Sequence, residues 1–316
     1  MNDRRPRVTT LLLERRTKAL RRHLPSAIAG DDNGVHQARV ATRRLREAVP
    51  VLANDLKDSK AGKARRKIRR LTRALGTVRE MDVTLQLLDA MASAERLPRA
   101  AIEDVRARVL AERERRREVM LRRLDRVDVE KLERRLASVG EALERCEHEA
   151  WRESLATRVM KRARRLEAAV EAAGQLYAPD RLHRVRIAAK KLRYGLELAA
   201  ESGQAAAVPQ VRLIKRVQEM LGKLNDLQVL QGHVAAVQAG ASEGQSSLQA
   251  LDVLARHIED ECRHLHGRYI ATAPALLAGC AAVRDTIGPA LAAPRRRSRA
   301  LKMALPRRPR AAVSGR

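Results

Sequence analysis

The chain contains one fifteen-residue segment twice, and this repeat limits the possible fold more than any other feature. Residues 35–49 align without a gap with residues 182–196. Ten of the fifteen paired positions are identical or conservatively changed. Both copies carry a His, an Arg three residues later, a basic pair four residues beyond that, and then Leu and Arg. The copies lie almost half of the 316 residues apart, which indicates a molecule built from two similar halves.

Both copies have the pattern of an amphipathic helix. At about 100° per residue, the basic side chains of each copy fall on one side and the alanine, valine and leucine side chains on the other. We call these basic sides the first stripe and the second stripe. The first stripe contains His36, Arg39, Arg43, Arg44 and Arg46, and the second contains His183, Arg186, Lys190, Lys191 and Arg193, followed by Tyr194. Like charges at these spacings repel each other, so an anion bound by the stripes would offset the repulsion.

A second pair of segments supports the duplication. Residues 68–88 match residues 214–234, and each contains Leu-Gly with an acid four residues after the Gly. We expect Gly76 and Gly222 to allow close approach of a neighbouring helix, because Gly within a helix is otherwise unfavourable. Glu80 and Asp226 are predicted to hold stripe arginines by charge-assisted hydrogen bonds, with ordinary surface ion pairs as the alternative. The basic residues before each Gly are further candidates for binding an anion: Arg66, Arg69, Arg70 and Arg73 in the first copy, and Arg212, Lys215 and Arg216 in the second.

The charge of the chain predicts an anionic partner. With 66 Lys and Arg against 38 Asp and Glu, the net charge is +28. Residues 294–316 carry nine of these bases and no acid, which leaves 28 minus 9, or +19, for residues 1–293. The chain has no Phe, and its other aromatic residues are Trp151, Tyr177, Tyr194 and Tyr269. Because unpaired bases are usually bound by stacking on aromatic rings, this composition favours contacts to phosphate over contacts to bases.

The composition also predicts an all-α fold. Ala, Leu, Arg and Glu dominate, and no segment alternates with a period of two. We predict two four-helix bundles related by a pseudo-twofold axis, with the first half at about 5–128 and the second at about 129–290. The charged run at 112–118 is expected to be a solvated helix face, and the basic tail at 294–316 to be disordered. The predicted helices cover residues 8–28, 35–54, 64–92, 98–126, 129–174, 181–201, 208–239, 246–272 and a shorter stretch to 287.

No motif predicts a metal, a cofactor or catalysis. Cys262, His264 and His266 are close in sequence, but only residues 262 and 266 share a helix face. The sequence has neither a phosphate-binding glycine loop nor a paired-carboxylate metal motif. The uncharged run at 269–283 is shorter than the ~18 residues of a membrane span and contains Pro274, so we expect no span. Three widely spaced cysteines favour a reduced cytoplasm.

The doubled pattern resembles the CHAD family, the conserved histidine α-helical domain. The resemblance rests on His36-x-x-Arg39, on His183-x-x-Arg186, on the bases that follow each, and on the two Leu-Gly-x-x-x-acid helices. It covers about residues 5–290 and implies a CHAD domain at 1–293, with two four-helix bundles around a basic central cavity. It also implies that the protein binds inorganic polyphosphate through the residues named above and associates with polyphosphate granules in bacteria.

The sequence departs from the family pattern in two respects. The family motif Arg-Asp-x-Asp-Val reads Arg-Glu-Met-Asp-Val at 79–83 and Asn-Asp-Leu-Gln-Val at 225–229. We therefore assign no binding role to Asp82 or Gln228. The chain also lacks the strand-borne Glu-x-Glu-x-Lys string of a CYTH-type triphosphate domain, which predicts a CHAD domain that stands alone.

We expect non-catalytic polyphosphate binding, with the two stripes facing each other across a linear polyanion. Arg suits this role because its planar fork matches phosphate oxygens. His36 and His183 are expected to contact phosphate and to gain a proton there, with a structural role as the alternative. Two other functions stay open. One is an architectural protein that binds the DNA or RNA backbone, with the basic tail as a further contact, and the other is a polyphosphate or triphosphate hydrolase.

Overall fold

The computed structural model describes residues 7–53, 59–93, 97–145, 150–240 and 245–293. These ranges hold α-helices and one short π-helical turn, with no strand among them, which confirms the all-α prediction. The helices are α1 (Val8–Ala29), α2 (Asp32–Leu52), α3 (Ser59–Ala74), α4 (Gly76–Ala92), α5 (Arg99–Asp125), α6 (Val129–Arg145), α7 (Ala150–Ala173), α8 (Pro179–Glu201), α9 (Ala207–Gln238), α10 (Gln245–Ala282) and α11 (Gly288–Ala292), with the π-helical turn at Val283–Ile287. The basic tail lies outside the described residues.

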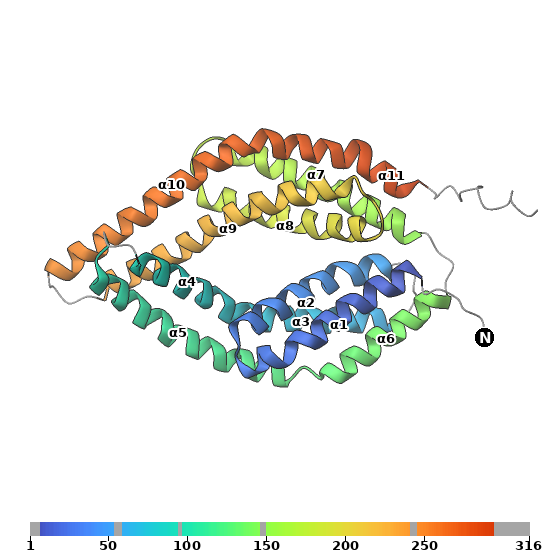
Figure 1. Ribbon diagram of the computed structural model, residues 1–316, viewed down its shortest axis with the longest axis horizontal. Helices are drawn as coiled ribbons and strands as arrows, with labels where there is room; N and C mark the ends of the chain where they lie inside the picture. The colour runs from blue at the N-terminus through green and yellow to red at the C-terminus, as the bar shows by residue number, and fades with distance from the viewer. Residues whose placement is uncertain (1–6, 54–58, 94–96, 146–149, 241–244, 294–316) are drawn as a thin grey trace, which may run out of the picture.

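The helices form two layers (Figure 1). In one layer α1, α2, α3 and α6 pack against one another, and in the other α7, α8, α9 and α10 do so, with α11 on α7. The layers meet where α2 contacts α8 and α7. The α4–α5 pair extends from the first layer and reaches α9 and α10 of the second. The helices that carry the two stripes, α2 and α8, therefore lie at the junction of the layers. The pseudo-twofold relation between the layers stays a prediction.

The boundary between the two layers lies later in the chain than the predicted boundary between the two halves. We placed the start of the second half at about residue 129, which is where α6 begins. However, α6 packs against α1 and α3 of the first layer. The two layers are therefore divided between α6 and α7, because α6 supplies the fourth helix that covers the first layer.

The turn between α1 and α2 shows how the first stripe is oriented. Gly30 has a φ of 89°, a left-handed conformation that suits Gly and ends α1. The side chain of Asp31 then caps α2 by accepting a hydrogen bond from the Gly34 N–H at 2.5 Å. A Cβ at Gly34 would lie 2.6 Å from the Cβ of Ser26, so Gly is needed for the close crossing of the two helices. Pro25 does not shorten α1, which continues to Ala29.

The predicted long helix at 64–92 is broken at Leu75 into α3 and α4. At Gly76 the guanidinium of Arg39 lies where a Cβ would be, so this Gly does allow a close approach, although by a side chain rather than by a helix. The matched α9 runs unbroken through Gly222, and nothing lies within 4 Å of a Cβ built there. The expectation of close helix approach is therefore wrong for Gly222.

The apolar sides of both stripe helices are buried in one continuous hydrophobic core. Ala38, Leu45 and Ala48 of α2 are 0% exposed, and so are Ala189 and Leu192 of α8. Burial of this kind contributes about 25 cal/mol per Å² of apolar surface, so it fixes which side of each helix faces the core. The basic sides consequently face away from the hydrophobic core, toward the junction of the two layers.

Helix α10 is longer than predicted and passes through Pro274 without ending. Within the described ranges, the helical stretch Ser247–Ala292 alone is long and apolar enough to cross a membrane by length and composition, with a mean hydropathy of 1.3 over an 18-residue window. In the structure α10 packs against α5, α7 and α9. The absence of a membrane span stays a prediction.

Candidate functional site

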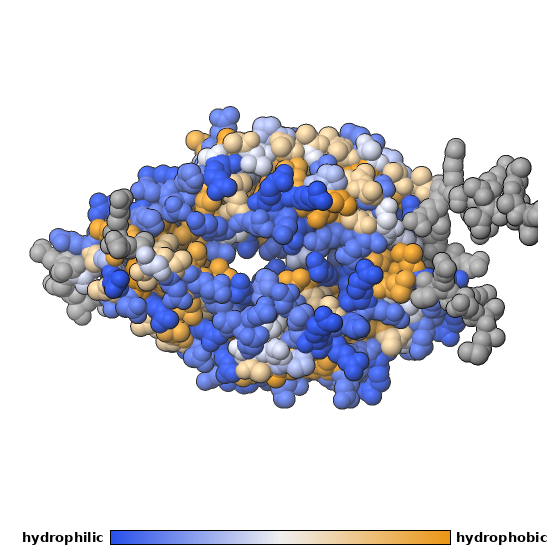
Figure 2. Space-filling view, viewed as in Figure 1, coloured by the Kyte–Doolittle hydropathy of each residue, from blue (hydrophilic) through white to orange (hydrophobic). Residues whose placement is uncertain are grey.

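The two stripes meet in one group of basic side chains between the layers. Arg39 and Arg43 on α2 interact electrostatically with Arg186 and Lys190 on α8, and Arg79 of α4 interacts with His36. All of these side chains are half-buried. Figure 2 shows an opening between the two layers that is bordered largely by hydrophilic residues. We call this group the central cluster; it contains His36, Arg39, Arg43, Arg79, Arg186 and Lys190.

The bases of the central cluster lack the carboxylate partners that Arg16 and Arg162 have. Within the described residues, no Asp or Glu oxygen lies within ion-pair distance of Arg39, Arg43, Arg79, Arg186 or Lys190. By contrast, Arg162 lies 2.5 Å from the carboxylate of Glu47 and Arg16 lies 2.9 Å from that of Glu201. Half-buried charge without a partner is unfavourable, so an anion at the cluster would offset this cost.

Burial and mutual repulsion change the acid–base properties of the cluster. Burial, followed by repulsion from Arg43, lowers the pKa of Arg39 to about 10. Burial, followed by repulsion from Arg43 and Arg186, lowers the pKa of Lys190 to about 6. Burial and then Arg79 lower the pKa of His36. At neutral pH Arg39 therefore stays charged, while Lys190 is mostly uncharged and His36 is shifted toward its uncharged form without a ligand.

The two histidines of the repeat have different surroundings. His36 is half-buried within the central cluster, whereas His183 is exposed at the start of α8. The Nδ1 atom of His183 lies 2.8 Å from the Oδ1 atom of Asn225. His183 therefore contacts α9, and its predicted contact with phosphate is less directly supported than that of His36.

The two acids of the Leu-Gly helices do not form the predicted hydrogen bonds with stripe arginines. Glu80 is paired with Arg116 of α5 at 2.7 Å. Asp226 lies near Arg186, but its hydrogen bond at 3.4 Å comes from the side chain of Asn225. Burial raises the pKa of Asp226, although Arg186 opposes this rise. Both acids are thus close enough to influence the cluster electrostatically without being its ion-pair partners.

Several predicted residues lie at the edge of the central cluster or away from it. Arg193 is paired with Glu197 at 3.0 Å and Arg44 with the same carboxylate at 3.4 Å. Tyr194 is 8% exposed and lies under the Arg193 guanidinium, 4.9 Å from ring centroid to Cζ. Lys191 is exposed on the other side of α8, at a cavity of about 300 Å³ beside α7.

Some of the predicted bases of α3 lie near the central cluster, whereas the other bases of α3 and those of α9 do not. Arg46 is close to Arg69 and Arg73, which extends the basic surface from the cluster along α3. Arg70 instead lies near Lys67, on the side of α3 that faces α6. Lys215 is paired with Glu219 at 3.7 Å. The remaining candidates are exposed on their helices without a described contact to the cluster: Arg66, Arg212 and Arg216.

Some residues important to the site were not predicted from the sequence. Arg79 belongs to the cluster, and its only signal was its place in the Arg-Glu-Met-Asp-Val motif beside Glu80. Glu47 follows the stripe residue Arg46 but is buried, where Arg158 and Arg162 of α7 hold it. This group joins α2 to the second layer, and an isolated Glu in a basic segment gave no sign of it.

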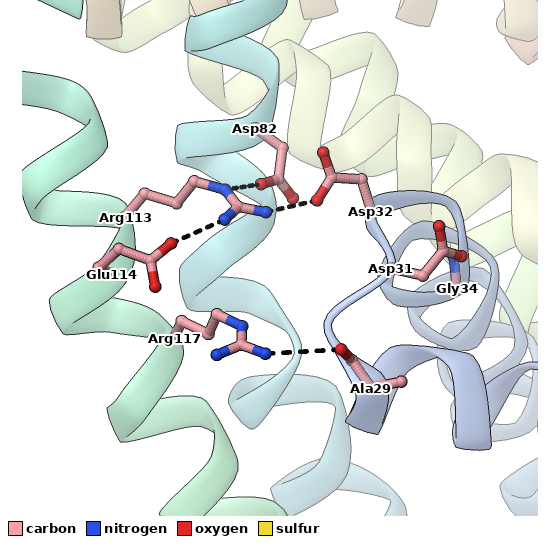
Figure 3. A network of polar contacts seen from close by, with 8 residues as sticks. All are labelled: Ala29, Asp31, Asp32, Gly34, Asp82, Arg113, Glu114 and Arg117. Carbon is pink, nitrogen blue, oxygen red and sulfur yellow. Dashed lines mark hydrogen bonds and ion pairs between the residues drawn. The ribbon is translucent and has the colours of Figure 1, made fainter. Parts of the chain in front are cut away.

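The charged run at 112–118 is not the solvated face that we expected. In Figure 3, Arg113 lies between Asp82 and Asp32, and Arg117 reaches the carbonyl oxygen of Ala29. The Nε of Arg113 donates to Asp82 at 2.8 Å, and Asp82 is 1% exposed. Arg115, in contrast, is exposed. The run therefore attaches α5 to α4 and to the start of α2.

The described residues include no group of three or more His, Cys, Asp or Glu side chains that could hold a metal ion. Cys262 is buried, and the ring of His266 lies 5.3 Å from that of Tyr177. The absence of a metal and of a cofactor stays a prediction.

The fold and the central cluster together define an all-α domain with a half-buried basic centre between two layers of helices. A family model described as the CHAD domain matches residues 11–235, well over half of the chain, and the chain belongs to that family. The resemblance seen in the sequence is thereby confirmed. No curated protein matches the sequence.

Two solved structures have a similar fold. One is the crystal structure of the CHAD domain from the plant Ricinus communis, with a TM-score of 0.55 and 21% identity, covering 87% of this chain and 91% of that chain. The other is PptA from Streptomyces chartreusis, with a TM-score of 0.60 and 13% identity, covering 84% of this chain and 97% of that chain. At these identities the likeness concerns the fold alone.

Proposed function

We propose that this protein binds inorganic polyphosphate at the central cluster without hydrolysing it, in the cytoplasm and at polyphosphate granules. The observation that supports this most is the concentration of half-buried cations that lack carboxylate partners, contributed by helices of both layers. Membership of the CHAD family supports the choice of polyphosphate among polyanions.

The chemistry of polyphosphate suits this arrangement. Each internal phosphate carries a charge, and there is no base or sugar to recognise. The guanidinium groups of Arg39, Arg43 and Arg186 offer planar forks that match phosphate oxygens. Because these groups come from α2 and α8, a linear chain between the layers would be contacted from two sides. Binding would also offset the repulsion that lowers the pKa values of Arg39 and Lys190.

The aromatic residues favour polyphosphate over single-stranded nucleic acid. Tyr194 beside the cluster is 8% exposed, Trp151 is 9% exposed and Tyr269 is 1% exposed. Tyr177 is more exposed, but its hydroxyl is bonded to Gln228 at 3.0 Å. The Tyr194 ring lies beside the cluster, but the Arg193 guanidinium covers one of its faces, and stacking on exposed rings is the usual means of holding unpaired bases.

The first test is a titration of the full-length protein at physiological salt. Polyphosphate should bind more tightly than duplex DNA or single-stranded RNA when ligands are compared at equal phosphate concentration, and its affinity should fall steeply with added salt. Equal or tighter binding of either nucleic acid would contradict the proposal and favour an architectural nucleic-acid-binding protein. Release of orthophosphate with Mg²⁺ or Mn²⁺ present would instead favour a hydrolase.

The second test places the ligand at the cluster. The double substitution Arg43→Glu with Lys190→Glu should abolish polyphosphate binding, while circular dichroism shows the helical content of the natural protein. A matched control is Arg122→Glu with Arg256→Glu, which changes the formal net charge equally at exposed positions outside the cluster. Loss of binding in both variants would show that net charge, rather than the cluster, holds the ligand.

A further inference from the structure

The two stripes differ in the kind of base at one position of the central cluster. Arg43 of the first stripe is matched by Lys190 of the second, seven residues after the His in each copy. The neighbouring pair, Arg44 and Lys191, differs in the same way, but Lys191 is exposed on the other side of α8. Arg keeps its charge in proteins, whereas Lys loses its charge readily when it is buried. The cluster thus contains one lysine among arginines.

Burial and the arginines around Lys190 disfavour its charged form. On α2 it faces Arg43 and Arg39, and on its own helix it lies near Arg186 and Arg193. On α9 it faces Asp226, which interacts with Lys190 but is itself shifted by burial toward its neutral form. On α7, the guanidinium of Arg162 donates to the backbone oxygen of Lys191, and on α4 Arg79 and Glu80 lie beside Asp226 and Arg186.

A bound polyanion would reverse this balance. Without ligand, Lys190 has four cationic neighbours and no carboxylate within ion-pair distance among the described residues. Phosphate oxygens beside its Nζ would favour the charged ammonium, because an opposite charge at close range stabilises the ionised form. The neutral amine of the free protein and the ammonium of the complex differ by one proton, which must come from the solvent.

We propose that the central cluster takes up a proton as polyphosphate binds, and that Lys190 is the group that receives it, so that binding weakens as the solution becomes alkaline. This proposal rests on the proposed function and adds a control of affinity by pH. A site made of arginines alone would keep its affinity as the solution becomes alkaline, because all of its groups stay charged.

The direction of the effect follows from proton linkage. The pKa of Lys190 in the free protein is about 6 and rises when the ligand binds. Its contribution to affinity is therefore complete below that value and is lost as the pH rises, by up to about tenfold per pH unit. His36, whose pKa is also lowered in the free protein, can add a dependence nearer neutrality. Terminal phosphates titrate near pH 6. We therefore choose the range from about pH 7.5 to about pH 8.5, where the change in affinity reports on Lys190 rather than on the phosphates.

The experiment measures polyphosphate affinity of the full-length protein at constant ionic strength across this range. For the natural protein, Kd should rise by up to about tenfold from about pH 7.5 to about pH 8.5. Calorimetry in two buffers of different ionisation enthalpy should show the uptake of close to one proton. A Kd that is constant over this range, with no proton uptake, would overturn the proposal while leaving polyphosphate binding intact. Failure to bind at any pH would overturn the proposed function itself.

Three variants assign the proton to Lys190. Lys190→Arg should remove the pH dependence and bind more tightly than the natural protein at alkaline pH. Lys190→Met should also remove it but should bind weakly at every pH, which keeps the test valid if Arg does not fit. Lys191→Arg, at the exposed neighbour, should keep the natural pH dependence. An unchanged slope and unchanged proton uptake in Lys190→Arg would assign the proton to another group.

Discussion

Among the residues, Lys190 and Lys191 differ in a way that the sequence could not predict. Both belong to the second stripe, and both match an Arg of the first copy. They are consecutive residues, which are about 100° apart around a helix. In the structure Lys190 lies in the central cluster, while Lys191 lines a cavity beside α7. The helical pattern predicted which side of α8 is basic. It could not predict the lowered pKa of Lys190, because that depends on burial between the layers and then on Arg43 and Arg39 of α2.

Gly76 offers a residue-scale test of how the Arg39 guanidinium is positioned. Gly76→Ala would place a methyl group where that guanidinium lies, and the guanidinium would have to move because α4 begins at this residue. We expect a severalfold loss of polyphosphate affinity in titrations, with little change in stability.

Gly222→Ala is the matched control for this substitution. Nothing lies within 4 Å of a Cβ at Gly222, and the residue is inside α9. Since Ala is favoured over Gly in a helix interior by about 1 kcal/mol, this variant should unfold at a higher denaturant concentration and bind polyphosphate as before. Equal affinity of the two variants would show that the position of Arg39 at Gly76 does not matter for binding.

At the scale of elements, the existence of the helices could be predicted and their connections could not. The repeat correctly placed α2 and α8, with their buried apolar sides. The break at Leu75 was missed, because it accompanies the contact between Gly76 and Arg39, which come from different helices. The role of α5 was missed for a similar reason. A run of alternating charge looks the same whether its partners are solvent or acids on α2 and α4.

Arg113 is predicted to be the main polar attachment of α5. Its guanidinium pairs with Asp82, whose side chain is 0% exposed, and with Asp32. Arg113→Met would leave the Asp82 carboxylate buried without its partner, and loss of one member of a buried pair costs about 3 kcal/mol. Chemical denaturation should show this decrease in the free energy of unfolding.

Two further variants make the expectation specific. Arg115→Met removes a base from the same run at a position that is 71% exposed, so stability should change by no more than about 0.5 kcal/mol. Combining Arg113→Met with Asp82→Asn removes the buried charge and should recover part of the loss. If Arg113→Met and Arg115→Met are equally stable, the α5 run is after all a solvated face.

At the scale of the whole molecule, the site depends on how two layers are held together. The hydrophobic core runs without interruption from one layer to the other, and the α4–α5 pair reaches from the first layer to α9 and α10. Glu47 of α2 adds an ion-pair contact to Arg158 and Arg162 of α7. The two stripes are thus fixed relative to each other by three kinds of contact.

A ligand held by both layers should stabilise the whole fold. We expect polyphosphate to raise the Tm of the protein in a thermal scan, because binding to the native state alone shifts the unfolding equilibrium by mass action. The rise should shrink as salt is added, in parallel with the loss of affinity. Added orthophosphate at the same phosphate concentration should have a smaller effect, since it cannot contact both stripes at once. Equal effects of the two anions would argue against a site that spans the layers.

The duplicated His-x-x-Arg helix has a consequence for how a polymer moves on the protein. A polyphosphate chain reads the same from either end, unlike a nucleic acid strand with its distinct ends. Under the proposed function, the site would therefore meet the same ligand in either orientation of the chain. Because every internal phosphate is also equivalent, the protein could shift along a bound chain one phosphate at a time. Such a protein would move along the surface of a granule without dissociating from it.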